Sequence, residues 1–440
     1  MGDLFAARTL MGVSLGFHII YATIGIGLPL MLMLAEGISL YSGDRHYRLM
    51  ARRWIRPAGL LFAIGAVSGT ILSFELGFLW PRFMELSGPL IGLPFWLEGY
   101  AFFLEAIFLA LYAYGEQRLS ERTLFLCTIP LALAAALSAI FVIGANAWMN
   151  MPSGFRLKDG ALVAVDPLQA MFNPAWLHQA LHGTLAAYAA TGFAMAGIYA
   201  LALLRGWAPV YGRKALVLTL AVGSLSLPLM LLSGDRSAAF LATHEKAKLA
   251  AAEALFVTQP GAPLIIGGWP DPKSKTVRYG VEIPGVLSYL AFRDIDAVVT
   301  GLDAFSADES PDPRLIHPFF DLMIGCFALL SVVAGWFWWQ RWRETELTGN
   351  RLLLWSLVLV APCGMIALES GWLVTEFGRQ PWIIHGLMRV ESGLTPTPGV
   401  GVVLLVFLIV YALLTLGLLQ LLLRSPAGKG DSELSGGGDS

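Results

Sequence analysis

Several residues inside long apolar runs are of types that ligate metals. His18 lies in LGFHIIYATIGIGLPL, Met323 lies in HPFFDLMIGCFALL, and His178 and His182 are four residues apart in PAWLHQALHGTLAAYAA, on one face of a helix. Singly, each histidine could be a structural hydrogen-bonding group, and the methionine a packing residue. Three histidines at a similar predicted depth favour cofactor ligation. His182 paired with Met323 would hold a low-spin haem b, because His/Met is the ligand set of electron-transfer haems.

Carboxylates also lie in the apolar runs, where an ionisable group is costly unless it is paired or used. Glu369, in ALESGWLVTEFGRQPW, is predicted at the same depth as the histidines. A ferric haem iron supplies a positive charge that lets a buried carboxylate stay ionised. Glu369 and His18 are therefore candidate ligands of two five-coordinate, reactive haems.

Three further carboxylates lie in or near predicted helices. Glu98 and Glu105 are seven residues apart in FWLEGYAFFLEAIFLALYAYGEQ, which places them on one helix face, about 10 Å apart along the axis. They either form ion pairs inside a bundle or relay protons, which is the common role of intramembrane carboxylates. Glu75, in SFELGFLW, is either another buried carboxylate or an interfacial one.

The elements that must position these residues are membrane-spanning helices. The chain of 440 residues is 56% hydrophobic and only 14% charged, which indicates an all-α integral membrane protein. A bilayer is spanned by roughly 20 apolar residues. About nine runs are this long, and we expect them to form a bundle that binds haems near its outer face. They lie near residues 11–35, 57–79, 91–114, 124–147, 178–204, 215–233, 314–339, 352–376 and 400–423.

The rest of the composition excludes other classes of protein. The net charge is −2, and nothing indicates a nucleic-acid partner. Cys127, Cys326 and Cys363 lie in apolar runs without a CxxC spacing, so we expect neither a disulfide framework nor a zinc site. The first apolar run is long enough to span a membrane, so we expect no cleavable signal peptide.

Loop charges orient the bundle. Most of the basic residues in short loops follow the first, third, fifth and seventh runs, and the connection after the first run, GDRHYRLMARRWIRP, is the richest. Basic loops face the cytoplasm. We therefore expect a bacterial cytoplasmic (inner) membrane protein with its N-terminus outside and its C-terminus in the cytoplasm.

The chain divides into four parts. Residues 1–233 are predicted to form transmembrane helices 1–6, and residues 314–424 helices 7–9. Between them, residues 234–313 form an extracytoplasmic loop of about 80 residues, and loops this long are usually functional or disordered. Within this loop FLATHEKAKLAAAEALF has helical composition, and TQPGAPLIIGGWPDPKSK is predicted to be irregular. Residues 425–440 are Gly/Ser-rich and predicted to be a disordered tail.

Five segments, taken in order, resemble subunit I of the cytochrome bd-type quinol oxidases, and their order and loop placement carry the resemblance over nearly the whole chain. They are a helix-1 histidine ten residues after Arg8, EG followed by AFFLE (98–105), NAWM (146–149), KLAAAE (248–253), and ESGW followed by GRQPW (378–382).

The resemblance implies an enzyme that oxidises quinol at the outer face and reduces O₂ to water with protons from the cytoplasm. It implies a second membrane subunit, subunit II, and allows small accessory subunits. It also implies a low-spin haem b between His182 and Met323. His18 and Glu369 would ligate a high-spin haem b and a haem d, or a further haem b in place of haem d.

The resemblance also implies roles for residues that are not ligands. Lys248 and Glu253 match the quinol-binding residues of the loop. Glu98, Glu105 and Ser138 would form the proton pathway. Arg8, Arg379 and Trp382 would form the environment of the haem propionates.

The chain departs from the family pattern around the haems. The helix-3 carboxylates are seven residues apart rather than the usual eight, and His178 has no counterpart. Asp321 stands where arginine is usual, Met365 where tryptophan is usual, and Glu75 where glutamine is usual. The departures indicate a divergent branch with a short quinol loop.

Two other functions are compatible with parts of the sequence. A proton-coupled transporter or channel would use Glu98, Glu105 and Glu369 as relay groups but leaves the histidine and methionine set without a purpose. A quinol-linked haem b electron-transfer protein without oxidase activity would use the haems but would not reduce O₂.

Overall fold

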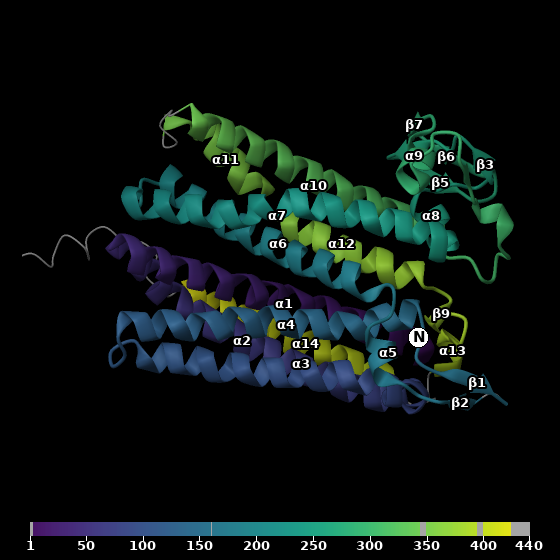
Figure 1. Ribbon diagram of the computed structural model, residues 1–440, viewed down its shortest axis with the longest axis horizontal. Coiled ribbons are helices and arrows are strands. Elements are labelled where there is room, and N and C mark those ends of the chain that lie inside the picture. Colours follow the sequence, from purple (N-terminus) through teal and green to yellow (C-terminus); the bar gives the residue numbers. More distant parts are fainter. Residues whose placement is uncertain (1–2, 160, 344–348, 394–398, 424–440) are drawn as a thin grey trace, which may run out of the picture.

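The computed structural model describes residues 3–159, 161–343, 349–393 and 399–423, which form a bundle of long helices (Figure 1). Within these residues, nine helical spans are long and apolar enough to cross a membrane, which confirms the predicted number. The predicted tail, 425–440, lies outside the described residues. The spans are α1 (Asp3–Ser42), α2 (Arg45–Leu79), α3 (Pro81–Gly115), α4 (Glu121–Asn150), α6 (Trp176–Leu204), α7 (Pro209–His244), α10 (Pro313–Trp342), α11 (Arg351–Val360) together with α12 (Cys363–Gly378), and α14 (Val400–Leu423).

Most helices extend beyond the apolar runs because capping groups, rather than hydropathy, set their ends. α2 begins after Asp44, α4 after Ser120 and α10 after Asp312. Each of these side chains accepts a hydrogen bond from an amide of the first turn, which satisfies a donor that the helix itself cannot pair. The polar helix ends therefore continue past the apolar segments.

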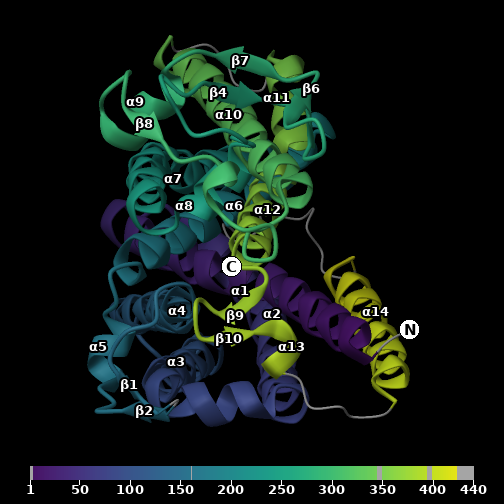
Figure 2. The same ribbon diagram turned by 90° about the vertical axis from the view of Figure 1, so that its right-hand side faces the viewer.

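α1 runs through the middle of the bundle (Figure 2). α2 and α4 pack against it on one side, with α3 against α4, and α6 packs on the other side with α7, α11 and α12 beyond it. α14 lies against α1. The helices on each side of α1 share an apolar core. One core contains Trp54 and Tyr112, and the other contains Phe193 and Phe337.

The segment between α7 and α10 forms a small cap, residues 245–312, at the end of the bundle that holds the N-terminus (Figure 1). It begins later than predicted, because α7 continues to His244. The prediction of an irregular TQPGAPLIIGGWPDPKSK is wrong in part, since short strands there pair their backbone groups. The cap contains α8 (Lys246–Ala252), α9 (Val286–Phe292), the 3-10 helix η1 (Leu302–Ala304), and the antiparallel pairs β3 (Gln259–Pro260) with β8 (Val298–Val299), β4 (Leu264–Ile266) with β7 (Val281–Ile283), and β5 (Trp269–Asp271) with β6 (Thr276–Arg278).

Two further connections lie at the same end of the bundle (Figure 1). The long connections of the chain thus gather at one end, where the predicted quinol-binding residues also lie. The elements of these connections are β1 (Arg156–Lys158) paired with β2 (Ala161–Val163), α5 (Pro167–Met171), β9 (Trp382–Ile384) paired with β10 (Met388–Arg389), and α13 (Val390–Gly393).

α6 and α7 pack closely against each other at two glycines. A Cβ at Gly192 would lie 2.6 Å from the Cα of Gly223, which is too close for two carbon atoms. We expect Gly192→Ala to lower the free energy of unfolding by about 1–3 kcal/mol through overpacking. The measurement is the thermal unfolding midpoint of the detergent-solubilised protein. Gly59→Ala is the control, because its new Cβ would meet no atom within 4 Å. Equal midpoints for the two variants would contradict the tight crossing.

Candidate functional site

Two histidines inside the bundle are held in one tautomer by serine hydroxyls. His18 Nδ1 lies 2.9 Å from Ser68 Oγ on α2, and His182 Nδ1 lies 2.8 Å from Ser233 Oγ on α7. Each serine donates its own hydrogen to a backbone carbonyl of the preceding turn, so it can only accept from the imidazole. Nδ1 therefore carries the hydrogen in both rings. Nε2 keeps a free lone pair, the form in which histidine binds a metal.

Glu369 lies beside the segment of α1 that precedes His18, and Met323 of α10 lies beside α12. Oε1 of Glu369 is buried without a hydrogen-bond partner in the described part of the chain, and Oε2 lies 3.6 Å from where a Cβ of Gly16 would be. The Met323 sulfur packs against Gly371, where a Cβ would be only 2.9 Å away. The carboxylate and the thioether are thus both available as ligand atoms.

The four candidate ligands lie in the half of the bundle nearest the cap. At a rise of 1.5 Å per residue, His182, Met323 and Glu369 lie roughly 9–15 Å from the cap-side ends of their helices, and His18 lies deeper, at roughly 22 Å. His178 is one turn from His182, and its ring packs against Phe240 with ring centroids 4.5 Å apart.

Arg379, directly after α12, has unfilled hydrogen-bonding capacity. It is 5% exposed, and its Nη2 donates to Glu376 Oε2 at 2.5 Å. Asn146 Nδ2 donates to the other oxygen of Glu376 at 2.6 Å. Nε and Nη1 of Arg379 have no partner in the described part of the chain. Because buried donors are nearly always satisfied, these two fit the carboxylates of a bound haem.

Arg8 and Trp382 flank this arginine. Arg8 is exposed and donates to Gln380 Oε1 at 3.1 Å, and the Trp382 amide donates to the Arg379 carbonyl at 2.9 Å. A cavity of about 290 Å³ lies between Arg8, Gln380 and the end of the cap near Asp308. The GRQPW segment therefore connects the N-terminus of α1, α12 and the cap.

Lys248 reaches from the cap into the bundle. It is 6% exposed, forms an ion pair with Glu245, and donates to Asn150 Oδ1 at 2.7 Å. Its stem passes over Gly378, where a Cβ would lie 2.7 Å from the lysine Cγ. Glycine at this position is what lets the lysine pass next to Arg379.

Glu253 lies at the other end of α8. It is 4% exposed, and its Oε2 has no hydrogen-bond partner among the described residues. Burial raises the pKa of its carboxyl to about 8, and the negative charge of Asp321 adds to the shift. Glu253 is therefore largely protonated at neutral pH and can exchange a proton near that range.

The predicted proton-relay residues lie on α3 and α4, two helices that pack together. Glu105 of α3 is buried. Glu98, two turns earlier on the same helix, is partly exposed, and Ser138 lies on α4. Glu75 is buried rather than interfacial. It accepts a hydrogen bond from Ser14 Oγ at 2.7 Å, and Ser14 accepts one from the Tyr411 hydroxyl, so Glu75 joins α1, α2 and α14.

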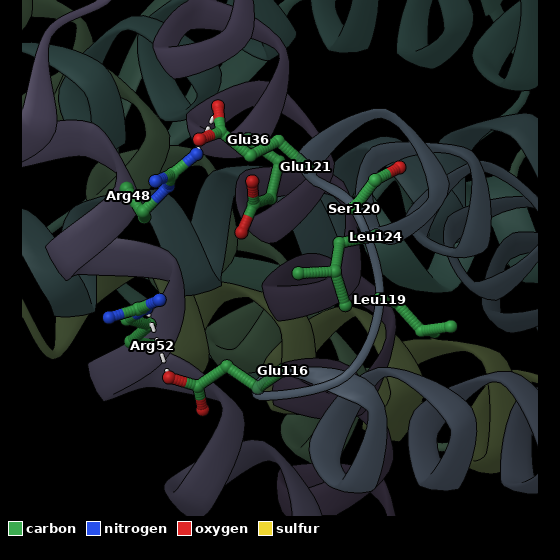
Figure 3. A pocket seen from close by; sticks show the side chains of 8 residues that line it. All are labelled: Glu36, Arg48, Arg52, Glu116, Leu119, Ser120, Glu121 and Leu124. Carbon is green, nitrogen blue, oxygen red and sulfur yellow. Dashed lines mark ion pairs between the residues drawn. The ribbon is translucent and has the colours of Figure 1, made fainter.

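A second cavity, of about 230 Å³, lies at the opposite end of the bundle, between α1, α2 and the α3–α4 connection (Figure 3). Glu36 lines it, is 3% exposed, and accepts a hydrogen bond from the Tyr112 hydroxyl of α3. Glu105 lies two turns earlier on the same helix. Two ion pairs link residues that line this cavity, Arg48 with Glu121 and Arg52 with Glu116.

Sequence reasoning missed the residues that orient the candidate ligands. Ser68 and Ser233 are small polar residues in apolar runs, and only this isolated polarity distinguishes them in the sequence; Asn146 stands in the NAWM segment, which does not indicate its partner. Their partners are 50, 51 and 230 residues away. Helix packing, rather than any local motif, brings each pair together.

Comparison with known proteins assigns nearly the whole chain to one family. Residues 6–429 match the family model of the cytochrome bd terminal oxidase subunit I. The chain belongs to this family. It is similar to a putative cytochrome bd menaquinol oxidase subunit I of Bacillus subtilis (strain 168), with 39% identity over 436 residues that cover 96% of each chain. It is 27% identical over 454 residues to the cytochrome bd-II ubiquinol oxidase subunit 1 of Escherichia coli (strain K12), with 86% of each chain covered.

The fold agrees with this membership. The bd oxidase structure from Geobacillus thermodenitrificans superimposes with a TM-score of 0.92 at 40% identity, and the match covers 96% of this chain and 98% of that one. The protein is therefore subunit I of a terminal quinol oxidase, a multi-pass membrane oxidoreductase of the respiratory chain. As a member of the cytochrome bd family it carries haems and works with a subunit II.

Proposed function

We propose that this subunit holds its haems in the half of the bundle nearest the cap. His182 and Met323 would hold a low-spin haem b. His18 and Glu369 would hold a high-spin haem b and a haem d, or a further haem b in its place. The observation that carries the proposal is the free Nε2 of both histidines, which the serine hydroxyls enforce. When bound, the haems supply one-electron transfer and a site for O₂ reduction.

The buried donors of Arg379 support a place for the haem propionates at the cap-side end of α12. Arg379 offers Nε and Nη1 to these carboxylates, and Arg8 and Trp382 complete their surroundings. Glu376 keeps the arginine in place through its ion pair.

Lys248 and Glu253 bind quinol in the cap, at the outer face of the membrane. Oxidation of a quinol releases protons together with electrons. The unpartnered Glu253 carboxylate accepts one of these protons, because its raised pKa makes it a base suited to near-neutral pH. Lys248, held by Glu245 and Asn150, fixes the position of α8 and interacts with a quinol oxygen.

Protons for the reduction of O₂ enter from the cytoplasm, at the end of the bundle opposite the cap. The cavity beside Glu36 supports an opening there, and Glu105, Glu98 and Ser138 pass protons on toward the haems. This orientation has the N-terminus outside and the C-terminus inside a bacterial cytoplasmic membrane. Subunit II covers part of the lipid-facing surface, and the remaining surface leaves room for small accessory subunits.

The haem assignment predicts distinct spectra for three variants. His182→Ala and Met323→Leu each remove the absorption of the low-spin haem, because each deletes a ligand. Ser233→Ala keeps the ligand but frees its ring, and we expect haem affinity to fall roughly 10- to 100-fold. The measurement is the reduced-minus-oxidised spectrum of the purified complex. His178→Ala is the control and should leave the spectrum unchanged. A low-spin band that survives in His182→Ala would contradict the assignment.

The quinol assignment predicts the pH dependence of turnover. Glu253 must be ionised to accept a proton, so the rate of quinol oxidation rises as the pH increases toward about 8. Glu253→Gln removes this rise and lowers the rate by roughly 100-fold. Lys248→Ala also lowers the rate, while the haem bands remain in both variants. The measurement is O₂ consumption with a quinol donor.

The control for this prediction is Glu282→Gln, which alters an exposed carboxylate of the same cap. It should keep both the rate and the pH profile of the parent protein. If Glu253→Gln behaves like this control, the assignment of quinol oxidation to the cap is wrong.

A further inference from the structure

His317 has an unusual set of hydrogen-bond partners. It lies near the start of α10 and is fully buried, with 0% exposure. Its Nδ1 lies 2.8 Å from the carbonyl oxygen of Ala252, and its Nε2 lies 3.1 Å from the carbonyl oxygen of Gly267 and 3.2 Å from Asp321 Oδ2. The three partners come from α8, from the turn between β4 and β5, and from α10 itself.

Both ring nitrogens therefore face acceptors. A backbone carbonyl cannot donate, and a neutral imidazole has only one N–H. A neutral His317 would direct a nitrogen lone pair at a carbonyl lone pair in a fully buried position, which is costly. A ring with hydrogens on both nitrogens donates to both carbonyls at once. Asp321 supplies the opposite charge next to it, as a buried cation requires.

The Asp321 carboxylate contributes to the same arrangement. Its Oδ2 accepts a hydrogen bond from the Gly267 amide at 2.9 Å. Both backbone groups of Gly267 are thus bound by the His317–Asp321 pair. Gly267 and Gly268 have φ angles of +70° and +91°, a conformation that glycine adopts without strain. The usual arginine at position 321 would place a donor where this amide needs an acceptor.

The Ala252 carbonyl lies in the last turn of α8, where the helix has no amide left to pair with it. His317 supplies that missing donor, and a cation is the favoured charge at a helix C-terminus. Glu253 is the next residue along the chain. Fixing the Ala252 carbonyl therefore fixes the backbone from which the Glu253 side chain extends (Figure 1 shows α8 beside α10).

We propose that His317 is a positioning residue for quinol oxidation, a buried imidazolium that ties α8 and the β4–β5 turn to α10 and so holds Glu253 in place. This inference rests on the proposed role of Glu253. It gives Asp321, the departure from the family pattern next to Met323, a purpose as the counter-ion of His317.

The charge state is tested first, on the intact oxidase with ¹⁵N-histidine and ¹³C-carbonyl alanine labels, by solid-state NMR. The contact between Nδ1 and the Ala252 carbonyl identifies His317 without any variant. We expect both ring nitrogens of His317 to carry hydrogens, because each faces a backbone carbonyl. A His317 with one bare nitrogen overturns the proposal.

The positioning role is tested by comparing two electron donors. His317→Gln offers one donor nitrogen in place of the two ring nitrogens, so we expect kcat with quinol to fall roughly 10- to 100-fold. Turnover with a tetramethylated phenylenediamine, which gives up an electron without releasing a proton, should be unchanged, as should the haem spectrum. A merely structural role would lower both rates together. The control is His244→Gln, an exposed histidine at the end of α7.

Each result decides the proposal. Unchanged quinol turnover in His317→Gln overturns it, and so does an equal loss with both donors. If His317→Gln fails to assemble, we expect His317→Lys, which keeps a cation with several donors, to assemble and to retain quinol turnover. A His317→Lys variant that does not assemble, or that assembles without quinol turnover, overturns the proposal. A parent oxidase that does not oxidise quinol at all would instead refute the proposed function, so the two failures are distinguishable.

Discussion

A polar or charged side chain inside a lipid bilayer must find its partner within the protein, and the structure of this subunit depends on that constraint. Ser68 and Ser233 hold two imidazoles in one tautomer, and the Tyr112 hydroxyl satisfies Glu36. The polar atoms that remain unpaired are therefore informative. They include Oε1 of Glu369 and two nitrogens of Arg379, which are the atoms that a haem iron and its propionates would engage.

The same constraint explains how the cap is attached to the bundle. α8 is a short helix whose polar groups are bound by side chains of the membrane helices. Lys248 reaches Asn150 of α4 across Gly378, and His317 of α10 binds the Ala252 carbonyl. The proposed quinol site is thus built partly from the bundle itself. Lys248 and Arg379 are separated by little more than one glycine, so the proposed quinol site and the haem-propionate site adjoin.

The two ends of the bundle carry different chemistry. The cap end holds the candidate ligands, Lys248 and Glu253, whereas the other end has a cavity with buried Glu36 and two arginine–glutamate ion pairs. α3 connects them, because it carries both Tyr112 and Glu105. In the proposed orientation, protons are released outside and taken up inside, so that turnover separates charge across the membrane.

The sequence by itself determined the number of membrane helices, because a span needs a long apolar run whatever its neighbours are. Charged residues in its apolar runs also predicted candidate sites: Glu369 and Glu105 stand out against an apolar background, whereas Lys248 was identified through the resemblance of KLAAAE to the family. Helix ends were predicted less well, since caps such as Asp44 and Asp312 extend helices beyond the apolar runs. The strands of the cap were missed because strands of two or three residues leave no periodic pattern.

Only the tertiary structure decided which polar residues meet. Ser233 could have faced lipid, and instead it orients His182. In the sequence, Asp321 replaces an arginine that is usual in the family. In the structure it is the partner of His317 and Gly267. His178, one turn from a candidate ligand, packs against Phe240 instead. The physical reason is that hydrogen bonds act over about 3 Å. The residues that make them are dozens to hundreds of positions apart, and helix packing alone brings them within that range.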